Sequence, residues 1–139
     1  MSPNKKKVRL FSDGACRGNP GIGGAGAVIV DGADNILWEG KEYLGPCTNN
    51  IAEYQALILG LKGALANGFA HLDVSLDSEL LAKQINGAYK VKNPNLKILM
   101  DEVRGLLSSF ESVDVRHVLR CHNAHADKLA NRAIDEHKS

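Results

Sequence analysis

Residues 7–13 read KVRLFSD, and residues 14–24, which follow them, read GACRGNPGIGG. Apolar and polar side chains alternate over the first stretch, and this pattern predicts a strand. The second stretch is rich in glycine, and we expect it to be a loop. Residues 25–30 and 36–44 predict two more strands, joined by a turn at residues 31–35. Three strands with such short connections are typical of an antiparallel meander.

The hydrophobic period changes after this meander. Apolar side chains between Tyr54 and Leu65 recur at helical spacing, which predicts a helix over residues 50–67 that ends at Gly68. The same patterns predict a strand over residues 72–76, a helix over 78–85, a helix over 96–110, a strand over 113–119 and a helix over 126–134.

The element order is therefore β-β-β-α-β-α-α-β-α, an α/β arrangement. The fourth and fifth strands follow helices, so we expect them to join the sheet in parallel through right-handed crossovers. The result is a mixed five-stranded sheet covered by helices, with ligands expected at the carboxyl ends of strands. The length of 139 residues suits a single domain over residues 1–139, in which residues 1–6 form a flexible basic tail.

Composition narrows the class of protein. The chain has 17 basic and 16 acidic residues, a net charge of +1 and 44% hydrophobic residues, which argues against disorder. No apolar run approaches the length that spans a bilayer, and the charged N-terminus lacks the apolar core of a signal peptide. We therefore expect a cytoplasmic protein. The three cysteines form no Cys-x-x-Cys pair, so we expect reduced thiols rather than a zinc site.

Four acidic residues fall where such a fold would bring them together. Asp13 and Asp77 end the first and fourth strands, and Glu53 and Asp127 lie in the first turns of the first and last helices. Close carboxylates repel one another, so a site that keeps them ionised needs a compensating cation. Mg²⁺ prefers oxygen ligands. Two such ions would activate a water and stabilise the departing 3′ oxygen of a phosphodiester.

Each acid also has a purely structural interpretation. Glu53 stands three residues after Asn50, as in a capping box. Asp127 suits the positive end of a helix dipole, Asp77 precedes a strand-to-helix cap, and Asp13 precedes a glycine as in a plain turn. The metal hypothesis therefore depends on the four acids taken together.

Four motifs identify a family. Residues 11–21 read FSDGACRGNPG, residues 48–56 read TNNIAEYQA, residues 76–78 read LDS, and residues 120–130 read RCHNAHADKLA. In this order and spacing they resemble the motifs of ribonuclease H type 1, and the resemblance covers residues 7–136.

The resemblance implies an endonuclease that hydrolyses the RNA strand of RNA–DNA hybrids and leaves 5′-phosphate and 3′-hydroxyl ends. It implies catalytic metal ligands at Asp13, Glu53, Asp77 and Asp127, holding two Mg²⁺ ions with substrate, with Mn²⁺ as a substitute. It also implies sheet order 3-2-1-4-5, an antiparallel second strand and helices on both faces. The expected partner is the hybrid, with no membrane and no obligate protein partner, and a monomer suffices.

The resemblance further implies substrate contacts through amide, hydroxyl, thiol and backbone groups. They are expected at Gly14, Cys16, Asn19, Thr48, Asn49, Asn50, Ser78 and Asn123. Amide side chains suit base edges and 2′-hydroxyls because they both donate and accept hydrogen bonds. Helix capping is the alternative for Asn49 and Asn50. A packed thiol is the alternative for Cys16, and it is the interpretation we favour for Cys47.

The chain departs from many relatives at two places. Residues 87–94 lead directly to the third helix without a basic handle, as in a compact subtype, so Lys90 and Lys92 would replace part of its charge. The loop before Asp127 is short. His122 is the candidate for assisting proton transfer there, with an exposed loop histidine as the alternative, and His125 is a lesser candidate.

Two other function classes compete with the enzyme. One is a hybrid-binding module that does not cut, and the other is a metal-stabilised structural domain. The presence of all four acids argues against the first, and the asparagine-rich second motif argues against the other.

Overall fold

A computed structural model describes residues 7–138, and the expected basic tail at residues 1–6 lies outside the described residues. Within the described part, five strands form a single sheet in the order β3-β2-β1-β4-β5. The strands are β1 (Val8–Gly18), β2 (Gly21–Val30), β3 (Ile36–Cys47), β4 (His71–Leu76) and β5 (Ser112–His117). β2 pairs antiparallel with β1 and β3, whereas β4 pairs parallel with β1 and β5. The expected strand order and the antiparallel second strand are confirmed.

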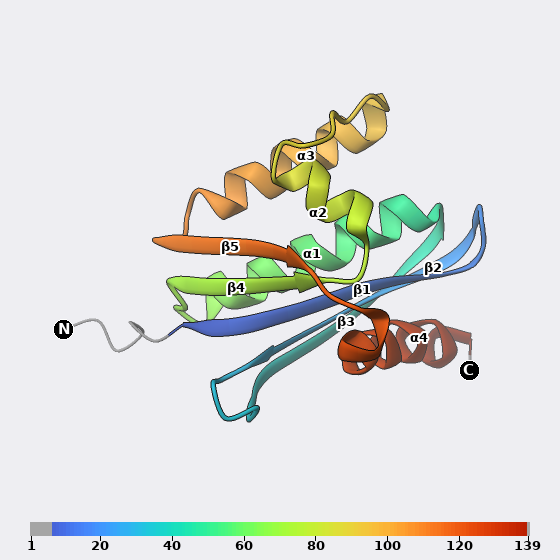
Figure 1. Cartoon of the computed structure of the whole chain (residues 1–139). Coiled ribbons are helices and arrows are strands. Elements are labelled where there is room, and N and C mark those ends of the chain that lie inside the picture. The colour runs from blue at the N-terminus through green and yellow to red at the C-terminus, as the bar shows by residue number, and fades with distance from the viewer. Residues whose placement is uncertain (1–6, 139) are drawn as a thin grey trace.

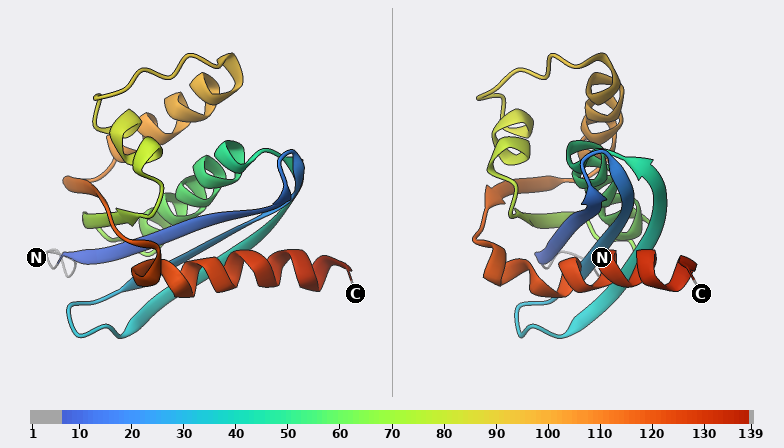
Figure 2. Two further views of the ribbon diagram at one scale, coloured as in Figure 1. Left: turned by 45° about the vertical axis from the view of Figure 1, so that its right-hand side comes forward. Right: turned by 90° about the vertical axis from the view of Figure 1, so that its right-hand side faces the viewer.

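Helices cover both faces of this sheet. The helices are α1 (Asn49–Ala66), α2 (Glu79–Ile85), α3 (Pro94–Leu107) and α4 (Ala124–Lys138), with a 3₁₀ turn η1 (Arg120–Asn123) before the last. Figure 1 shows α1 on one face, with α2 and α3 on that side, and α4 on the opposite face; Figure 2 shows the same layers from two other directions.

The main core lies between the sheet and α1. Leu10 of β1, Leu72 of β4, and Leu57 and Leu61 of α1 are fully buried there. Burial of each such side chain contributes roughly 1.5–3 kcal/mol to folding. The phenol of Tyr54, in the same layer, donates a 2.7 Å hydrogen bond to Gln84 of α2. This core fixes α1 against β1 and β4, the two strands whose ends carry acidic residues.

The expected loop over residues 14–24 is wrong. This segment continues β1 and begins β2, and the two strands pair as far as Gly18 opposite Gly21. Two of these glycines stand where a helix crosses the sheet closely: a Cβ built on Gly14 would meet the backbone of α1, and one built on Gly24 would meet the backbone carbonyl of Ala130 in α4. Glycine in this stretch therefore reflects a close approach of helix to strand rather than an open loop.

Several element ends also differ from expectation. α1 begins at Asn49, one residue earlier than expected, because the Thr48 hydroxyl accepts a 3.2 Å hydrogen bond from the Ile51 N–H and caps the helix in place of Asn50. The third strand runs on to Cys47, α3 stops at Leu107, β5 stops at His117, and α4 starts at Ala124.

The connection between α2 and α3 is residues 86–93, and it carries no further helix within the described part of the chain. None of the helices described for residues 7–138 is both long enough and apolar enough to cross a membrane.

Candidate active site

Two neighbouring parallel strands supply the first pair of carboxylates. β1 and β4 run side by side with Ser12 opposite Leu76. Asp13 is the next residue of β1, and Asp77 follows the last residue of β4. Because the strands point the same way, both side chains emerge at one edge of the sheet, as the sequence predicted.

The third carboxylate, Glu53, comes from α1, which packs closely against Gly14 of β1. A Cβ built on Gly14 would lie 2.5 Å from the backbone nitrogen of Glu53, so a larger residue would push the helix away. The Gly14 N–H donates a 3.4 Å hydrogen bond to Glu53 Oε1. Glu53 lies beyond the first turn of α1, so its expected place in that turn is wrong, and the alternative of a capping box with Asn50 does not hold because Thr48 caps the helix.

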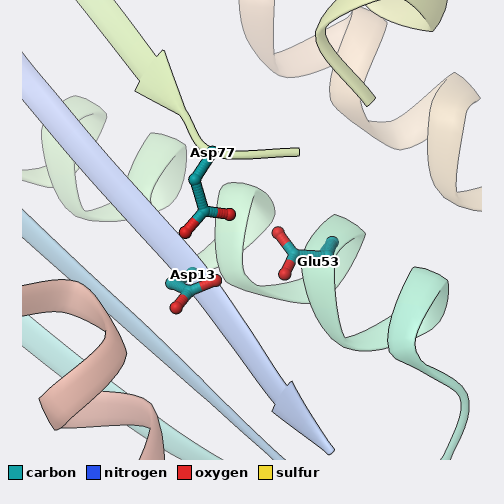
Figure 3. A group of neighbouring side chains, drawn as sticks. All are labelled: Asp13, Glu53 and Asp77. Atoms are coloured by element: carbon teal, nitrogen blue, oxygen red, sulfur yellow. The ribbon is translucent and has the colours of Figure 1, made fainter. Parts of the chain in front are cut away.

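These three side chains point toward one another (Figure 3). Asp13, Glu53 and Asp77 each offer an oxygen, and these oxygens all lie within 4.8 Å of one another. Asp13 is only 1% exposed. Burial, together with the charge of Glu53, raises the pKa of Asp13 to about 10. Burial raises the pKa of Glu53 to about 7. The cluster therefore disfavours full ionisation unless a positive charge is supplied.

A hard divalent cation fits this donor set. All three side chains offer oxygen, which Mg²⁺ and Mn²⁺ prefer. The buried Oδ1 atom of Asp13 has no hydrogen-bond partner among the described residues. A buried carboxylate oxygen without a partner is costly to maintain. A cation ligated by that oxygen would remove the cost and would also lower the repulsion within the cluster.

The fourth expected carboxylate, Asp127, lies in the first turn of α4, as predicted. It lines the same pocket of about 490 Å³ as the other three, although it is not part of their tight cluster. Its carboxyl lies close enough to Asp13 to raise the pKa of that residue. The position of α4 therefore sets how far Asp127 stands from the cluster.

Most of the expected substrate contacts surround this pocket. Those that line it are Gly14, Cys16, Asn49, Asn50 and Ser78. An adjoining pocket of about 400 Å³ shares the two asparagines and adds Asn19 and Thr48. Their proposed contacts with substrate remain predictions.

Three of these side chains already have partners within the protein. The Asn19 side chain accepts a 3.1 Å hydrogen bond from the Asn49 N–H. The Ser78 hydroxyl caps α2 by accepting from the Leu81 N–H at 3.2 Å. The Cys16 thiol donates to the carbonyl of Cys47 at 3.2 Å. Capping is therefore a role of Ser78 and Thr48, whatever else they do.

Asn123 differs from the expectation of a substrate contact. It is 1% exposed, and its amide nitrogen donates to the Ser12 carbonyl at 2.8 Å and to Asp77 Oδ2 at 3.2 Å. A buried amide committed to these partners orients Asp77 and ties η1 to β1. This geometry favours a role for Asn123 in holding the Asp77 carboxylate in place, and its contact with substrate stays a prediction.

The two histidines lie apart from the carboxylate pocket. His122 lines a separate pocket on the α4 side of the sheet, formed with Phe11, Val28 and Ile36, and it is exposed. The His125 ring bonds the carboxylate of Glu39 on β3. This geometry favours the alternative interpretation of His122 as an exposed loop residue.

Arg120, which the sequence left undecided, lines the carboxylate pocket instead. Its Nε lies 4.0 Å from Asp77 Oδ2, and its side chain is 83% exposed. The charge of Arg120 acts on Glu53 too, since it lowers the pKa of that residue against the larger effect of burial. Arg120 is therefore the cationic side chain at the rim of the site.

The sequence of this chain is similar to a family profile and to several curated proteins. A family profile described as "Reverse transcriptase-like" matches residues 11–133. The chain is 42% identical over 130 residues to the protein named ribonuclease HI of Halobacterium salinarum, a match that covers 94% of this chain and 65% of that protein. Matches to mycobacterial relatives cover 36% of their length. The chain thus spans less than two thirds of these relatives.

Solved structures agree with the sequence matches. The crystal structure of RNase H1 from Halobacterium salinarum is similar with a TM-score of 0.91 at 42% identity, covering 94% of this chain and 98% of that one. The structure of LC11-RNase H1 in complex with an RNA/DNA hybrid is similar with a TM-score of 0.90 at 39% identity, covering 95% of this chain and 99% of that one.

Proposed function

Because the chain belongs to the ribonuclease H type 1 family, we propose that it is an endonuclease that hydrolyses the RNA strand of RNA–DNA hybrids. The observation that carries the proposal is the convergence of Asp13, Glu53 and Asp77 from three separate elements, with a buried Asp13 oxygen that lacks a partner. A relative that covers nearly the whole chain was solved with an RNA/DNA hybrid, which supports the substrate class.

Divalent cations are part of this proposal. Asp13, Glu53, Asp77 and Asp127 would hold Mg²⁺, with Mn²⁺ as a substitute. Two such ions, when bound, would supply activation of a water and stabilisation of the departing 3′ oxygen, so that the products would carry 5′-phosphate and 3′-hydroxyl ends.

The chain's own groups keep these carboxylates oriented. The Gly14 N–H holds one oxygen of Glu53, and the Asn123 amide holds one oxygen of Asp77. Asp13 is fixed by its strand and by burial rather than by a hydrogen bond at Oδ1. A site whose ligands are oriented before substrate arrives pays little reorganisation cost during the reaction.

Other residues at the pocket would hold the hybrid. The exposed amides of Asn49 and Asn50 can both donate and accept, so they suit base edges and 2′-hydroxyls in a minor groove. The guanidinium of Arg120 offers a planar fork of donors that matches phosphate oxygens, so its role is to hold a phosphate of the hybrid. Lys90 and Lys92 would add charge where the basic handle is missing.

We further infer that residues 1–139 act as one domain, that the domain works as a monomer without an obligate protein partner, and that the reaction takes place in the cytoplasm. The near balance of 17 basic and 16 acidic residues and the free cysteines among the described residues are consistent with this setting.

The test is a cleavage assay with labelled RNA in an RNA–DNA hybrid, beside duplex DNA and duplex RNA, with Mg²⁺ or Mn²⁺. The proposal predicts cleavage of the hybrid's RNA strand alone, and product ends that a ligase or kinase identifies as 5′-phosphate and 3′-hydroxyl. Binding of the hybrid without cleavage under either metal would favour the non-cutting module instead.

A further inference from the structure

Asp127 depends on α4 for its position, because it stands outside the tight cluster that β1, α1 and β4 bring together. Its helix is held on the sheet by contacts from β1 and β2. One of those contacts leads to Asp127 through two side chains. Arg17 lies within the first motif without an expected role there, and Asn131 lies just beyond the fourth motif.

Arg17 lies near the end of β1 and reaches across to α4. Its Nη1 donates to Asp135 Oδ1 at 2.7 Å, and its Nη2 donates to Asn131, to the side-chain oxygen at 3.3 Å and to the backbone carbonyl at 3.4 Å. The guanidinium is thus fixed between two residues of α4, one turn apart. It holds the helix against the strand that carries Asp13.

The half-buried amide of Asn131 continues this chain of hydrogen bonds to Asp127. Its Nδ2 donates to the Asp127 carbonyl at 3.0 Å and to Asp127 Oδ1 at 3.4 Å. The donor from Arg17 decides the orientation of the amide, since only the oxygen of Asn131 can accept from a guanidinium. The nitrogen of Asn131 must then face Asp127.

We propose that Asn131, held by Arg17, is a positioning residue that orients the Asp127 carboxylate toward the divalent-cation site. This deepens the proposed function and rests on it for the identity of the reaction. Groups that orient a metal-binding side chain in this way change metal affinity or activity about 10-fold to 100-fold when they are removed.

The experiment uses Asn131→Ala, Arg17→Ala and the double variant, with Lys41→Ala as the control. Lys41 of β3 pairs with Glu136 of the same helix, so the control removes a strand-to-helix ion pair that does not touch Asp127. Asn131→Ala introduces a stronger helix former, so loss of helix would not explain an effect.

Two measurements are made on each variant. Calorimetric titration with Mn²⁺ in the absence of substrate reports metal affinity independently of catalysis. Hybrid cleavage as a function of Mg²⁺ concentration reports the half-saturating concentration, with KM for the hybrid measured at saturating Mg²⁺.

We expect Asn131→Ala and Arg17→Ala each to weaken Mn²⁺ binding and to raise the half-saturating Mg²⁺ concentration about 10-fold. High Mg²⁺ should restore the rate, and KM for the hybrid should stay unchanged. The double variant should be no worse than Asn131→Ala, because both act along one path. Lys41→Ala should match the original protein.

Unchanged Mn²⁺ affinity in both single variants would overturn the proposal, as would an equal change in Lys41→Ala. If the original protein bound Mn²⁺ with this dependence on Asn131 but did not cleave hybrid, the proposed function would fail while the positioning role stood. The two ideas therefore fail by different observations.

Discussion

A substitution at Gly26 of β2 would displace α4, and with it the proposed metal ligand Asp127, without changing Asp127 itself. A Cβ built on Gly26 would lie 2.6 Å from the backbone nitrogen of Ala130 and 2.8 Å from the Cβ of Leu129. Ordinary contacts between such atoms are about 3.5–4.0 Å, so α4 must move away by about 1 Å in a Gly26→Ala variant. The atoms in the way are backbone and Cβ atoms, which cannot rotate aside.

This displacement has two measurable consequences. Overpacking of this kind costs typically about 1–3 kcal/mol of folding free energy. For a chain of this size, each kcal/mol lowers Tm by roughly 4 °C. The same movement carries Asp127 with the helix, and a misplacement of about 1 Å can reduce the rate by about 100-fold. We therefore expect activity to fall more than the loss of folded protein would explain.

The assay compares urea unfolding and hybrid cleavage for Gly26→Ala with those of Gly105→Ala. Gly105 lies in α3, and a Cβ added there meets nothing within 4 Å. That control should gain about 1 kcal/mol from helix propensity and keep full activity. If Gly26→Ala were as stable and as active as the original protein, the close approach of α4 to β2 would not control Asp127.

Further predictions concern single side chains of the site. Asp13→Asn should reduce cleavage at least about 1,000-fold, the equivalent of several kcal/mol of lost metal stabilisation, in the same hybrid assay. Because the folded pKa of Asp13 is raised from 3.8 to about 10, the folded state binds more protons than the unfolded state between these values. In EDTA, the unfolding free energy should therefore fall as pH rises from about 4 to about 10, and urea titrations should show a flatter fall in Asp13→Asn. Burial raises the pKa of Cys47 from 9.0 to about 11. Iodoacetamide at pH 8 should therefore modify Cys47 about 100-fold more slowly than the exposed thiol of Cys121, as measured by peptide mass spectrometry. Equal rates at the two cysteines would contradict the burial of Cys47. Arg120→Ala should weaken hybrid binding and reduce the salt slope of log K by about 1, whereas His122→Ala should leave turnover within about 2-fold. A larger effect at His122 than at Arg120 would reverse our assignment of the two residues.

The sequence predicted the sheet and the meeting of acids because both follow from local signals. Alternation over residues 7–13 and helical spacing after Tyr54 are properties of short segments. The convergence of Asp13 and Asp77 needs only parallel neighbours of known direction. Glycines at residues 14 and 24 suggested a loop, because the helix residues that require glycine there, Ala52 of α1 and Ala130 of α4, lie far along the chain.

The finer parts of the site depend on side-chain orientation, which sequence does not contain. Asn123 belongs to a motif in the sequence, but only its burial and its bond to Asp77 reveal a positioning role. His122 and Arg120 are two residues apart, and the turn of η1 decides which one faces the carboxylates. Arg17 and Asn131 meet across more than 110 residues of chain, so no local pattern signals their contact.

The most direct test of the proposed metal centre is to locate the site at which the chain binds a divalent cation. Crystals soaked in Mn²⁺ and measured by anomalous diffraction would reveal that place without reference to activity. We predict an anomalous peak between Asp13, Glu53 and Asp77, absent in Asp13→Asn. A peak elsewhere on the molecule, or no peak at these carboxylates at saturating Mn²⁺, would contradict the claim that they form a metal centre.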